Sequence, residues 1–408
     1  MNLARAKIKM KNDLTSREYS PDELKDAFIK LYGKSGKDVR VYSSPARINI
    51  IGEHIDYNGG KVFPACINRY LYLALRKRKD SKIIYNDLRF PGSYEFDLNE
   101  AFTYDKKNDY ANYLNGIIQQ LKERGFSFDS GFEILMASNI PAGSGISSSS
   151  ALECGFAYAL TDSFGFKLDR IEIAKLGQMS EHNFMNVKCG IMDQFIIATG
   201  KKNYAELLDC STLEYEYVPL ELGDYKFVVM NTNKKRTLAD SKYNERRSQC
   251  ERALKILQDS GLKISALCQL TPDKWEQVSD LVSDPIQNKR ARHCIYENQR
   301  VIDAATTLRQ GDLENLGKLL CQSHKSLKED YQVTGIELDT LAETAQKQEG
   351  CLGARMTGAG FGGCAIALVH RDKIDGFIEN VQAAYSHAIG WEAGFFVCGT
   401  GDGVSLVG

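Results

Sequence analysis

The sequence feature that most constrains the fold is a glycine- and serine-rich loop between a strand pattern and a helix pattern. The strand pattern is GFEILMASNI, and PAGSGISSSSALE follows it. Leu152, Phe156 and Leu160 then recur at helical spacing. Gly143 and Gly145 let the main chain approach a ligand closely. Because free N–H groups and the helix dipole favour anions at a helix N-terminus, the stretch predicts a phosphate-binding loop.

Residue identity excludes two familiar glycine loops. A P-loop requires Lys next to its final Ser or Thr, and this loop has no Lys. The dinucleotide pattern fails because Ser148 stands where its third Gly should lie. A flexible serine-rich connector is the structural alternative, although loops of this kind are usually short and ordered.

A second constraint is an apolar strand pattern that ends in polar residues. Ile48 to Ile51 are branched or apolar residues that fit a buried strand. The polar residues after them are Glu53, His54, Asp56 and Tyr57. Asn58-Gly59 is the strongest short hairpin signal, so we expect it to join two paired strands. Loops held by rigid strands often carry chemistry. A structural role beneath the turn is the alternative for His54 and is favoured for Tyr57.

Composition limits the class of protein and its partners. The 408 residues, 43% of them hydrophobic, can bury large cores and fit two domains. With a net charge of −1, the chain offers no global field for nucleic acid or anionic lipid, so we expect neither partner. No apolar run is long enough for a bilayer span or placed as a secretory signal. The eleven cysteines include no C-x-x-C pair, which fits a cytoplasmic location.

The chain divides into two halves of similar character. From about Lys201 the pattern restarts with new strands, several helices and two final strands. No Pro, Gly or Ser linker and no internal repeat marks the join. We predict two packed α+β domains, residues 1–205 and 206–408, with the active site in the cleft between them.

The stretch PAGSGISSSSALE resembles the nucleotide loop of the GHMP small-molecule kinases, which phosphorylate sugars, homoserine and mevalonate without a Walker lysine. A kinase also needs a group that orients the acceptor hydroxyl and a group that absorbs charge on the phosphoryl group. Asp193, in the first turn of an apolar helix, is the candidate for the first task, with a helix cap as the alternative. Arg47 is the candidate for the second task, with a surface arginine as the alternative.

Glu181 is a candidate metal ligand. It follows Gly177 by one helical step and Ile173 by two, so it projects from the core-facing side of its helix. An unpaired carboxylate there would be costly, and a hard cation with oxygen ligands would compensate it. A salt bridge to Lys or Arg is the alternative.

Three further blocks resemble the galactokinase family within the GHMP kinases: PARINIIGEHIDYNGG, SEHNFMNVKCGIMDQF and GARMTGAGFGGC. They occur in the family's order. The resemblance implies a ribosomal-S5-domain-2-like N-terminal mixed sheet with helices and a ferredoxin-like C-terminal α/β sandwich. It also implies transfer of the ATP γ-phosphate to the anomeric hydroxyl of α-D-galactose, with ATP and Mg²⁺ as cofactors. We expect a monomer.

The resemblance also assigns roles to residues. Asp193 would orient or deprotonate the hydroxyl, and Arg47 would stabilise the pair. The implied sugar contacts are Glu53, His54, Asp56, Gly190 and Tyr243. The implied nucleotide contacts are Pro141, Gly143, Ser144, Gly145, Ser147, Ser148, Ser149, Ser150 and Tyr110, which replaces a usual Trp. The implied Mg²⁺ ligands are Ser149 and Glu181. We expect the glycines of MTGAGFGGC to let the backbone approach the nucleotide loop or the sugar.

Two alternatives to a galactokinase activity stay open. Ile55 also occurs in kinases for N-acetylgalactosamine, so that activity, or another hexose 1-kinase, is one alternative. A non-catalytic galactose and ATP sensor is the other. Known sensors tend to have a damaged nucleotide loop, whereas the serine run from Ser147 to Ser150 is intact here, which favours catalysis.

Overall fold

The computed structural model describes residues 19–33, 38–141, 145–234 and 239–408. Its largest sheet has six strands in the order β13-β1-β3-β6-β4-β5. Neighbouring strands are antiparallel except β4 and β6, which are parallel. The strands are β1 (Arg40–Asn49), β3 (Pro64–Lys77), β4 (Lys82–Asp87), β5 (Phe90–Asp97), β6 (Phe132–Ser138) and β13 (Ser405–Leu406).

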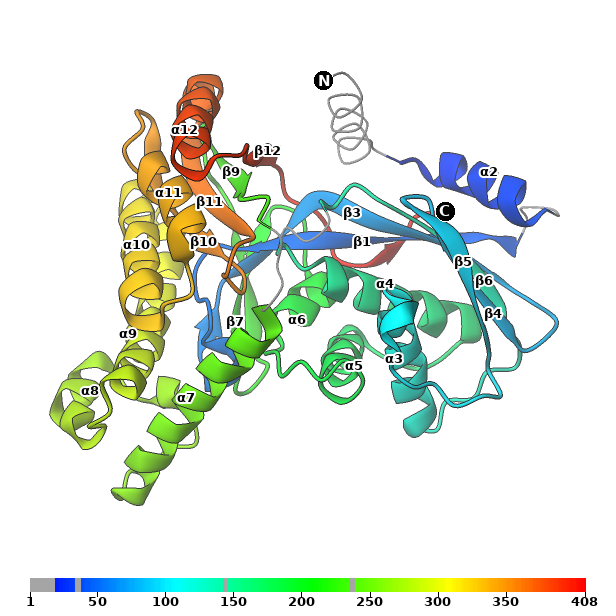
Figure 1. Cartoon of the computed structure of the whole chain (residues 1–408), viewed down its shortest axis with the longest axis horizontal. Coiled ribbons are helices and arrows are strands. Elements are labelled where there is room, and N and C mark those ends of the chain that lie inside the picture. The colour runs from blue at the N-terminus through cyan, green and yellow to red at the C-terminus, as the bar shows by residue number, and fades with distance from the viewer. Residues whose placement is uncertain (1–18, 34–37, 142–144, 235–238) are drawn as a thin grey trace.

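Helices lie on both sides of this sheet (Figure 1). One side carries α3 (Ala111–Glu123), α4 (Ser148–Phe164), α5 (Arg170–Asn183) and α6 (Met192–Thr199). Helix α4 packs on β1 and β3, and the segment just before it is tied to β1 because the N–H of Arg47 donates to the carbonyl of Ile146. Helix α2 (Pro21–Tyr32) lies on the other side and buries Leu24 and Phe28.

The second half of the chain forms a four-stranded antiparallel sheet in the order β10-β11-β9-β12. Its strands are β9 (Tyr225–Asn231), β10 (Cys351–Thr357), β11 (Cys364–His370) and β12 (Gly394–Cys398). The helices of this half are α7 (Ala239–Asp259), α8 (Pro272–Val278), α9 (Pro285–Arg309), α10 (Leu313–Ser326), α11 (Gly335–Ala345) and α12 (Ile374–Ile389). Helices α10 and α11 pack on β10, and α9 packs on α10.

Smaller elements complete the fold. A three-stranded antiparallel sheet contains β2 (Lys61–Val62), β7 (Tyr204–Asp209) and β8 (Tyr215–Pro219). The 3-10 helices are η2 (Asp56–Asn58), η3 (Lys106–Asn108), η4 (Leu267–Gln269), η5 (Ser279–Leu281) and η7 (Arg371–Lys373). One π-helical turn, η6 (Leu327–Tyr331), follows α10.

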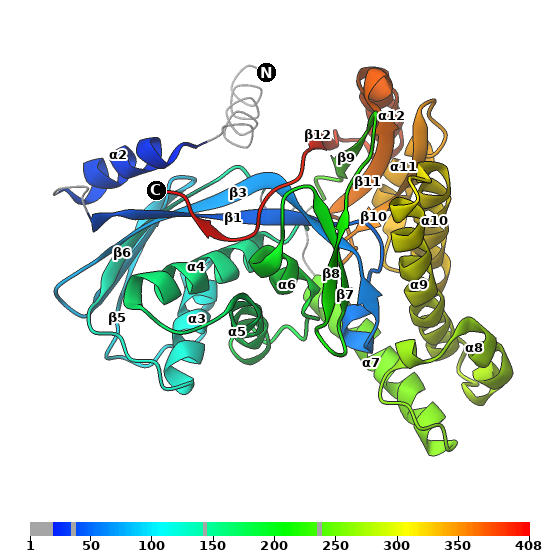
Figure 2. The same cartoon turned by 180° about the vertical axis from the view of Figure 1, so that it is seen from behind.

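The chain crosses between the two halves more than once. After β12 it returns to the six-stranded sheet, where β13 pairs with β1 (Figure 2). The predicted boundary after residue 205 falls within β7, which pairs with β2 from the first half. The division into domains 1–205 and 206–408 stays a prediction.

The hairpin predicted at Asn58-Gly59 is wrong in its detail. Strands β1 and β3 do pair antiparallel, with Asn49 opposite Pro64, but residues 50–63 connect them. Asn58 ends the 3-10 turn η2 and Gly59 follows in the left-handed region at φ +69°. The dipeptide therefore makes a turn inside the long connection between β1 and β3.

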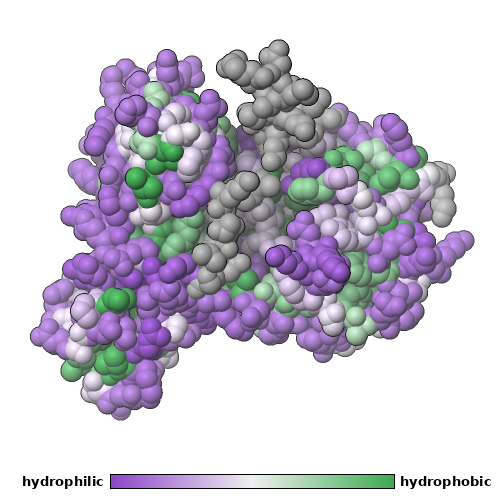
Figure 3. All heavy atoms as spheres, in the orientation of Figure 1, coloured by the Kyte–Doolittle hydropathy of each residue, from purple (hydrophilic) through white to green (hydrophobic). Residues whose placement is uncertain are grey.

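One face of the molecule is mostly polar. On the face in Figure 3 hydrophilic residues predominate, and apolar residues form separate small patches. Within the described parts of the chain, no helix has both the length and the apolar character needed to cross a bilayer.

Candidate active site

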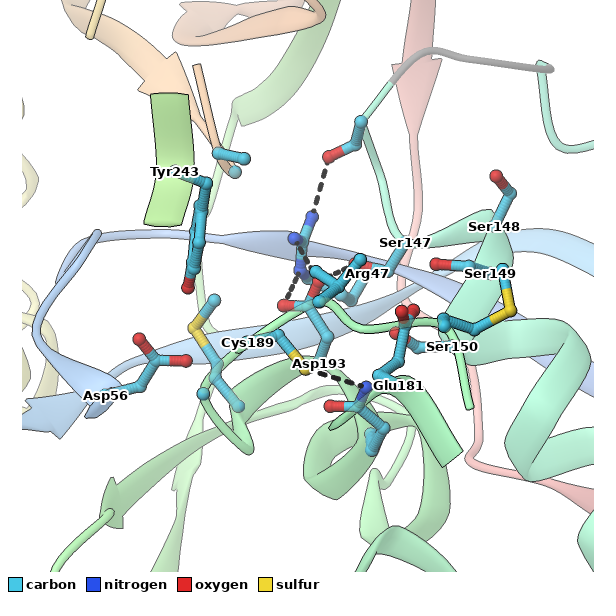
Figure 4. A pocket seen from close by; sticks show the side chains of 18 of the residues that line it. Arg47, Asp56, Ser147, Ser148, Ser149, Ser150, Glu181, Cys189, Asp193 and Tyr243 are labelled. Atoms are coloured by element: carbon cyan, nitrogen blue, oxygen red, sulfur yellow. Dashed lines mark hydrogen bonds and ion pairs between the residues drawn. The ribbon is translucent and has the colours of Figure 1, made fainter. Parts of the chain in front are cut away.

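A cavity of about 360 Å³ lies where β1, the N-termini of α4 and α6, and the turn after β10 meet. Figure 4 shows how its side chains converge from these elements. The predicted site residues that line it are Arg47, Glu53, His54, Asp56, Gly145, Ser147, Ser148, Ser149, Ser150, Glu181, Gly190, Asp193 and Tyr243. Gly143 and Ser144 lie outside the described residues. Pro141 and Tyr110 are described but do not line this cavity.

Arg47 and Asp193 form the centre of the site. The Nε of Arg47 donates to Oδ1 of Asp193 at 2.8 Å, and its second terminal nitrogen donates to Oδ2 at 2.7 Å. The Arg47 side chain is 3% exposed, which excludes a surface arginine, whereas Asp193 is 28% exposed and faces the cavity. The N-cap residue of α6 is Ile191, and Asp193 follows it within the first turn of the helix.

The serine loop is joined to this ion pair. Ser147 has a left-handed backbone at φ +67°, and its hydroxyl donates to Oδ2 of Asp193 at 2.5 Å. The carbonyl of Gly145 accepts from Arg47 at 3.1 Å. Helix α4 begins at Ser148, so its free N–H groups face the same cavity. The loop therefore presents an anion-binding helix terminus next to a carboxylate and a guanidinium.

Glu181 and Ser149 line the cavity together and offer two oxygen donors. Glu181 is only 6% exposed. Glu153, one turn after Ser149 on α4, is fully buried, and neither of its oxygens has a hydrogen-bond partner among the described residues. Burial, followed by the charge of Glu181, raises the pKa of Glu153. The carboxyl group of Glu181 and the hydroxyl of Ser149 suit a hard cation.

Glu53 is buried and accepts from four groups. Its Oε1 accepts from the N–H of Gly358 at 2.7 Å and the hydroxyl of Thr357 at 3.1 Å. Its Oε2 accepts from Asn49 and Arg355, each at 2.5 Å. A sugar contact by Glu53 stays a prediction, and protein donors already engage both oxygens.

Asp56 and Gly190 fit against each other. A Cβ on Gly190 would lie 1.8 Å from Oδ2 of Asp56, so only glycine leaves room for this carboxyl group. Burial, followed by repulsion from Asp193, raises the pKa of Asp56 to about 7. Both residues line the cavity, so the carboxyl group can meet a hydroxyl-bearing ligand there.

His54 belongs to a chain of buried hydrogen bonds. Its Nε2 lies 3.1 Å from the carbonyl of Ala359, which can only accept, so Nε2 carries the proton. Nδ1 then accepts from the hydroxyl of Tyr57 at 2.8 Å, and Tyr57 contacts the hydroxyl of Tyr331 at 2.8 Å. Burial lowers the pKa of His54 to about 3, so the ring is neutral. The structural role favoured for Tyr57 agrees with this chain, and both ring nitrogens of His54 are occupied.

Aromatic residues line two other parts of the cavity. The ring of Tyr243, on α7, lies 5.3 Å from those of His54 and Tyr57. Tyr110 instead packs against Phe90 and Tyr94, outside the cavity lining. The nearby rings that do line the cavity are those of Tyr104 and Tyr113. Tyr110 was singled out by its place in a family segment, which does not fix the direction of a side chain.

The glycine turn after β10 closes one side of the cavity. Gly358 has φ +85°, and a Cβ there would lie 2.6 Å from the carbonyl of Gly145. The expected approach of this backbone to the nucleotide loop is therefore present.

Sequence reasoning overlooked Arg355, Glu297 and His293, which hold the loop after β1. Arg355 donates to the carbonyls of Asn49 and Ile50 and to Glu53. Arg355 lies inside the block GARMTGAGFGGC, so a buried charge in an apolar strand was the available signal. Glu297 and His293 lie on α9 with no motif around them.

Comparison with known proteins agrees with this geometry. The family model for the GHMP kinases N terminal domain matches residues 112–201, and that for the GHMP kinases C terminal matches residues 304–387. The galactokinase galactose-binding signature matches residues 26–77. A galactokinase of Clostridium beijerinckii is 48% identical over 387 residues, which is 94% of this chain and 98% of that protein. The chain belongs to the galactokinase family.

Other galactokinases and solved structures extend this assignment. The galactokinase of Ligilactobacillus salivarius is 47% identical over 94% of this chain and 99% of its own. The crystal structure of Lactococcus lactis galactokinase complexed with galactose has a TM-score of 0.91 and 47% identity, covering 94% of this chain and 99% of that one. Methanococcus jannaschii mevalonate kinase, at 22% identity and a TM-score of 0.63, shares the fold over 89% of this chain and 98% of its own. The expected galactokinase resemblance and GHMP fold are confirmed.

Proposed function

We propose that this galactokinase-family enzyme transfers the γ-phosphoryl group of ATP to the anomeric hydroxyl of α-D-galactose, giving α-D-galactose 1-phosphate and ADP. The observation that carries the proposal is the Arg47–Asp193 ion pair, which touches the serine loop on one side and faces Asp56 across the cavity. The 47% identical Lactococcus lactis enzyme was crystallised with galactose, which supports the same sugar here.

In this mechanism Asp193 is the group nearest the acceptor hydroxyl. The anomeric oxygen attacks the γ-phosphorus, its proton passes toward the Asp193 carboxylate, and the bond to the β-phosphate oxygen breaks so that ADP leaves. Arg47 holds Asp193 by two hydrogen bonds and supplies positive charge beside the transferred group. The backbone N–H groups at the start of α4 bind the phosphates.

Ser149 and Glu181 are the residues that would hold Mg²⁺. A hydroxyl and a carboxylate on the cavity wall match the oxygen ligands that this ion prefers. Mg²⁺ bound there would neutralise phosphate charge. The position of these residues beside Ser147 and Ser148 supports the assignment, because the phosphates must lie at the same helix terminus.

The sugar side of the cavity consists of Glu53, Asp56, Gly190 and Tyr243, with His54 behind them. We propose that Asp56 binds a sugar hydroxyl and that Gly190 leaves space for this contact. On the nucleotide side Tyr104 and Tyr113 are better placed than Tyr110 to contact the adenine ring.

The alternatives have less support from the site. Ile55, the residue also found in kinases for N-acetylgalactosamine, is fully buried and does not line the cavity. A sensor would not need the carboxylate, guanidinium and helix terminus brought together here. The thiols of all eleven cysteines are free in the structure, which supports the proposed cytoplasmic location. A monomer stays part of the proposal.

A panel of free sugars tests the proposal. The purified chain is mixed with ATP, Mg²⁺ and galactose, N-acetylgalactosamine, glucose or mannose, and ADP release is followed in a coupled assay. We expect turnover with galactose, and a phosphorus-to-H1 coupling in the product by NMR. Faster turnover of N-acetylgalactosamine would instead assign that kinase, and galactose binding without turnover would favour the sensor.

A further inference from the structure

Arg355 is a fully buried arginine that lies outside the cavity lining. One terminal nitrogen donates to the carbonyls of Asn49 and Ile50, both at 3.0 Å, and the other donates to Oε2 of Glu53. Its Nε donates to the hydroxyl of Ser323 at 3.2 Å. Every group it contacts lies at the end of β1, in the loop after it, or on α10.

These contacts form part of a closed circuit, a ring of hydrogen bonds that begins and ends at Arg355. The hydroxyl of Ser323 donates to Oε1 of Glu297 at 2.6 Å, and the same oxygen accepts from the N–H of Gly52 at 3.1 Å. Gly52 precedes Glu53, which returns the circuit to Arg355. Burial disfavours the charged form of Glu297, but Arg300 and then His293 lower its pKa to about 2. The circuit therefore contains one buried guanidinium, that of Arg355, and two buried carboxyl groups, those of Glu53 and Glu297, which hydrogen bonds hold in one arrangement.

A second set of contacts holds the next residues of the loop. His293 lies 3.1 Å from the carbonyl of Glu53, and His54 lies 3.1 Å from that of Ala359. His54 has a left-handed backbone at φ +64°, which a residue with a Cβ adopts only when its surroundings hold it. The loop that carries Glu53 and Asp56 is therefore held from helices α9 and α10 and strand β10.

We propose that Arg355 is a positioning residue for the reaction, which fixes the sugar-side loop by holding Glu53 and the carbonyls of Asn49 and Ile50. It contacts neither substrate and acts through Glu53. This inference rests on the proposed function. It implies that the second half of the chain sets the geometry of the sugar contacts, while the first half supplies most of the nucleotide loop.

The decisive variant is Arg355→Lys, which keeps the charge but cannot reach two carbonyls, a carboxylate and a hydroxyl at once. Losing hydrogen bonds to a charged group should raise the KM for galactose about tenfold or more. The serine loop keeps its contacts, so the KM for ATP should change by less than about threefold. A general loss of structure would instead lower the amount of active enzyme and leave both KM values unchanged.

The matched control is Arg309→Lys, because Arg309 makes an exposed ion pair with Glu216. It should leave both KM values near those of the wild type. Thermal unfolding is measured for each variant. If Arg355→Lys does not fold, Ser323→Ala takes its place, since it removes only the hydroxyl that links Arg355 to Glu297. That variant should raise the KM for galactose about threefold.

Calorimetric titration with galactose separates failure of this inference from failure of the proposed function. A folded Arg355→Lys, or the folded substitute Ser323→Ala, that binds and phosphorylates galactose like the wild type overturns the positioning role alone. An equal rise in the KM for galactose and for ATP also overturns it. A wild-type protein that neither binds nor phosphorylates galactose overturns both proposals.

Discussion

The guanidinium of Arg47 holds the carboxylate of Asp193 by two hydrogen bonds, of 2.8 and 2.7 Å, although 146 positions separate the residues in sequence. Arg47 lies near the end of β1, the second strand of the six-stranded sheet, and Asp193 lies in the first turn of α6. Ser147 donates to the same carboxylate from the nucleotide loop. Three separate segments thus meet at one carboxylate, and this convergence underlies the predictions below.

Asp193→Asn should lower kcat by at least about 10²-fold, because an amide cannot accept the proton and repels one of the donors of Arg47. Galactose binding should stay measurable by calorimetry, since Asp56 and Tyr243 are unchanged. Asp129→Asn is the control, because Asp129 is 72% exposed in its ion pair with Lys77. Full activity of Asp193→Asn would refute its role.

Arg47→Lys and Arg47→Ala should both lose activity, with Arg47→Ala losing about 10²-fold or more in kcat. Lys cannot form the two parallel hydrogen bonds to Asp193 and also reach the carbonyl of Gly145, so it should not restore full activity. Steady-state rates of the folded variants test this. A near-normal kcat in Arg47→Ala would show that the guanidinium of Arg47 does not take part in catalysis.

The pKa of Asp56, raised to about 7, predicts a pH effect on galactose binding. If the ionised carboxylate binds the sugar, the KM for galactose should fall as the pH rises from 6 to 8, by up to about tenfold per pH unit below that pKa. The dependence should disappear in Asp56→Asn, whose KM should be high at every pH. A wild-type KM that is independent of pH over this range contradicts the assignment.

The same group should make folding stability depend on pH. An unfolded aspartate ionises near pH 4, so between about pH 4 and 7 the folded state holds a proton that the unfolded state releases. The contribution of Asp56 to stability is thus complete below pH 4 and declines as the pH rises through its folded pKa. Asp56→Asn should therefore gain stability relative to the wild type as the pH rises from 4 to 8, which urea unfolding at several pH values can measure.

Gly190→Ala should raise the KM for galactose by about tenfold or more, because the new Cβ would displace the carboxyl group of Asp56. The KM for ATP should change little. The control is Gly376→Ala in α12, where a Cβ meets nothing within 4 Å. That substitution should stabilise the helix by about 0.5–1 kcal/mol without changing either KM.

Tyr104→Ala should raise the KM for ATP several-fold, since base stacking on an aromatic ring contributes about 1 kcal/mol. Tyr110→Ala should leave that KM unchanged and lower the melting temperature, because its ring packs on Phe90 and Tyr94. A raised KM for ATP in Tyr110→Ala, with an unchanged KM in Tyr104→Ala, would instead assign the adenine contact to Tyr110.

Much of the fold could be predicted from local sequence patterns. The helix that begins at Ser148 and strands such as β9, β11 and β12 follow from periodicity, since the core selects one face of each element. The turn at Asn58-Gly59 could also be predicted, but its position inside a long loop could not. A dipeptide fixes local backbone angles, whereas the partner of a strand depends on packing far away in the sequence.

The sequence by itself determined which residue types were available for chemistry: a carboxylate in an apolar helix, an arginine at a strand and a run of serines before a helix. Only the tertiary structure decided their partners. It joined Arg47 to Asp193, placed Tyr104 rather than Tyr110 in the cavity lining, and supplied Arg355 and Glu297 from distant elements. The physical reason is that a buried charge must find its hydrogen-bond partners, and long-range folding alone brings those partners within reach.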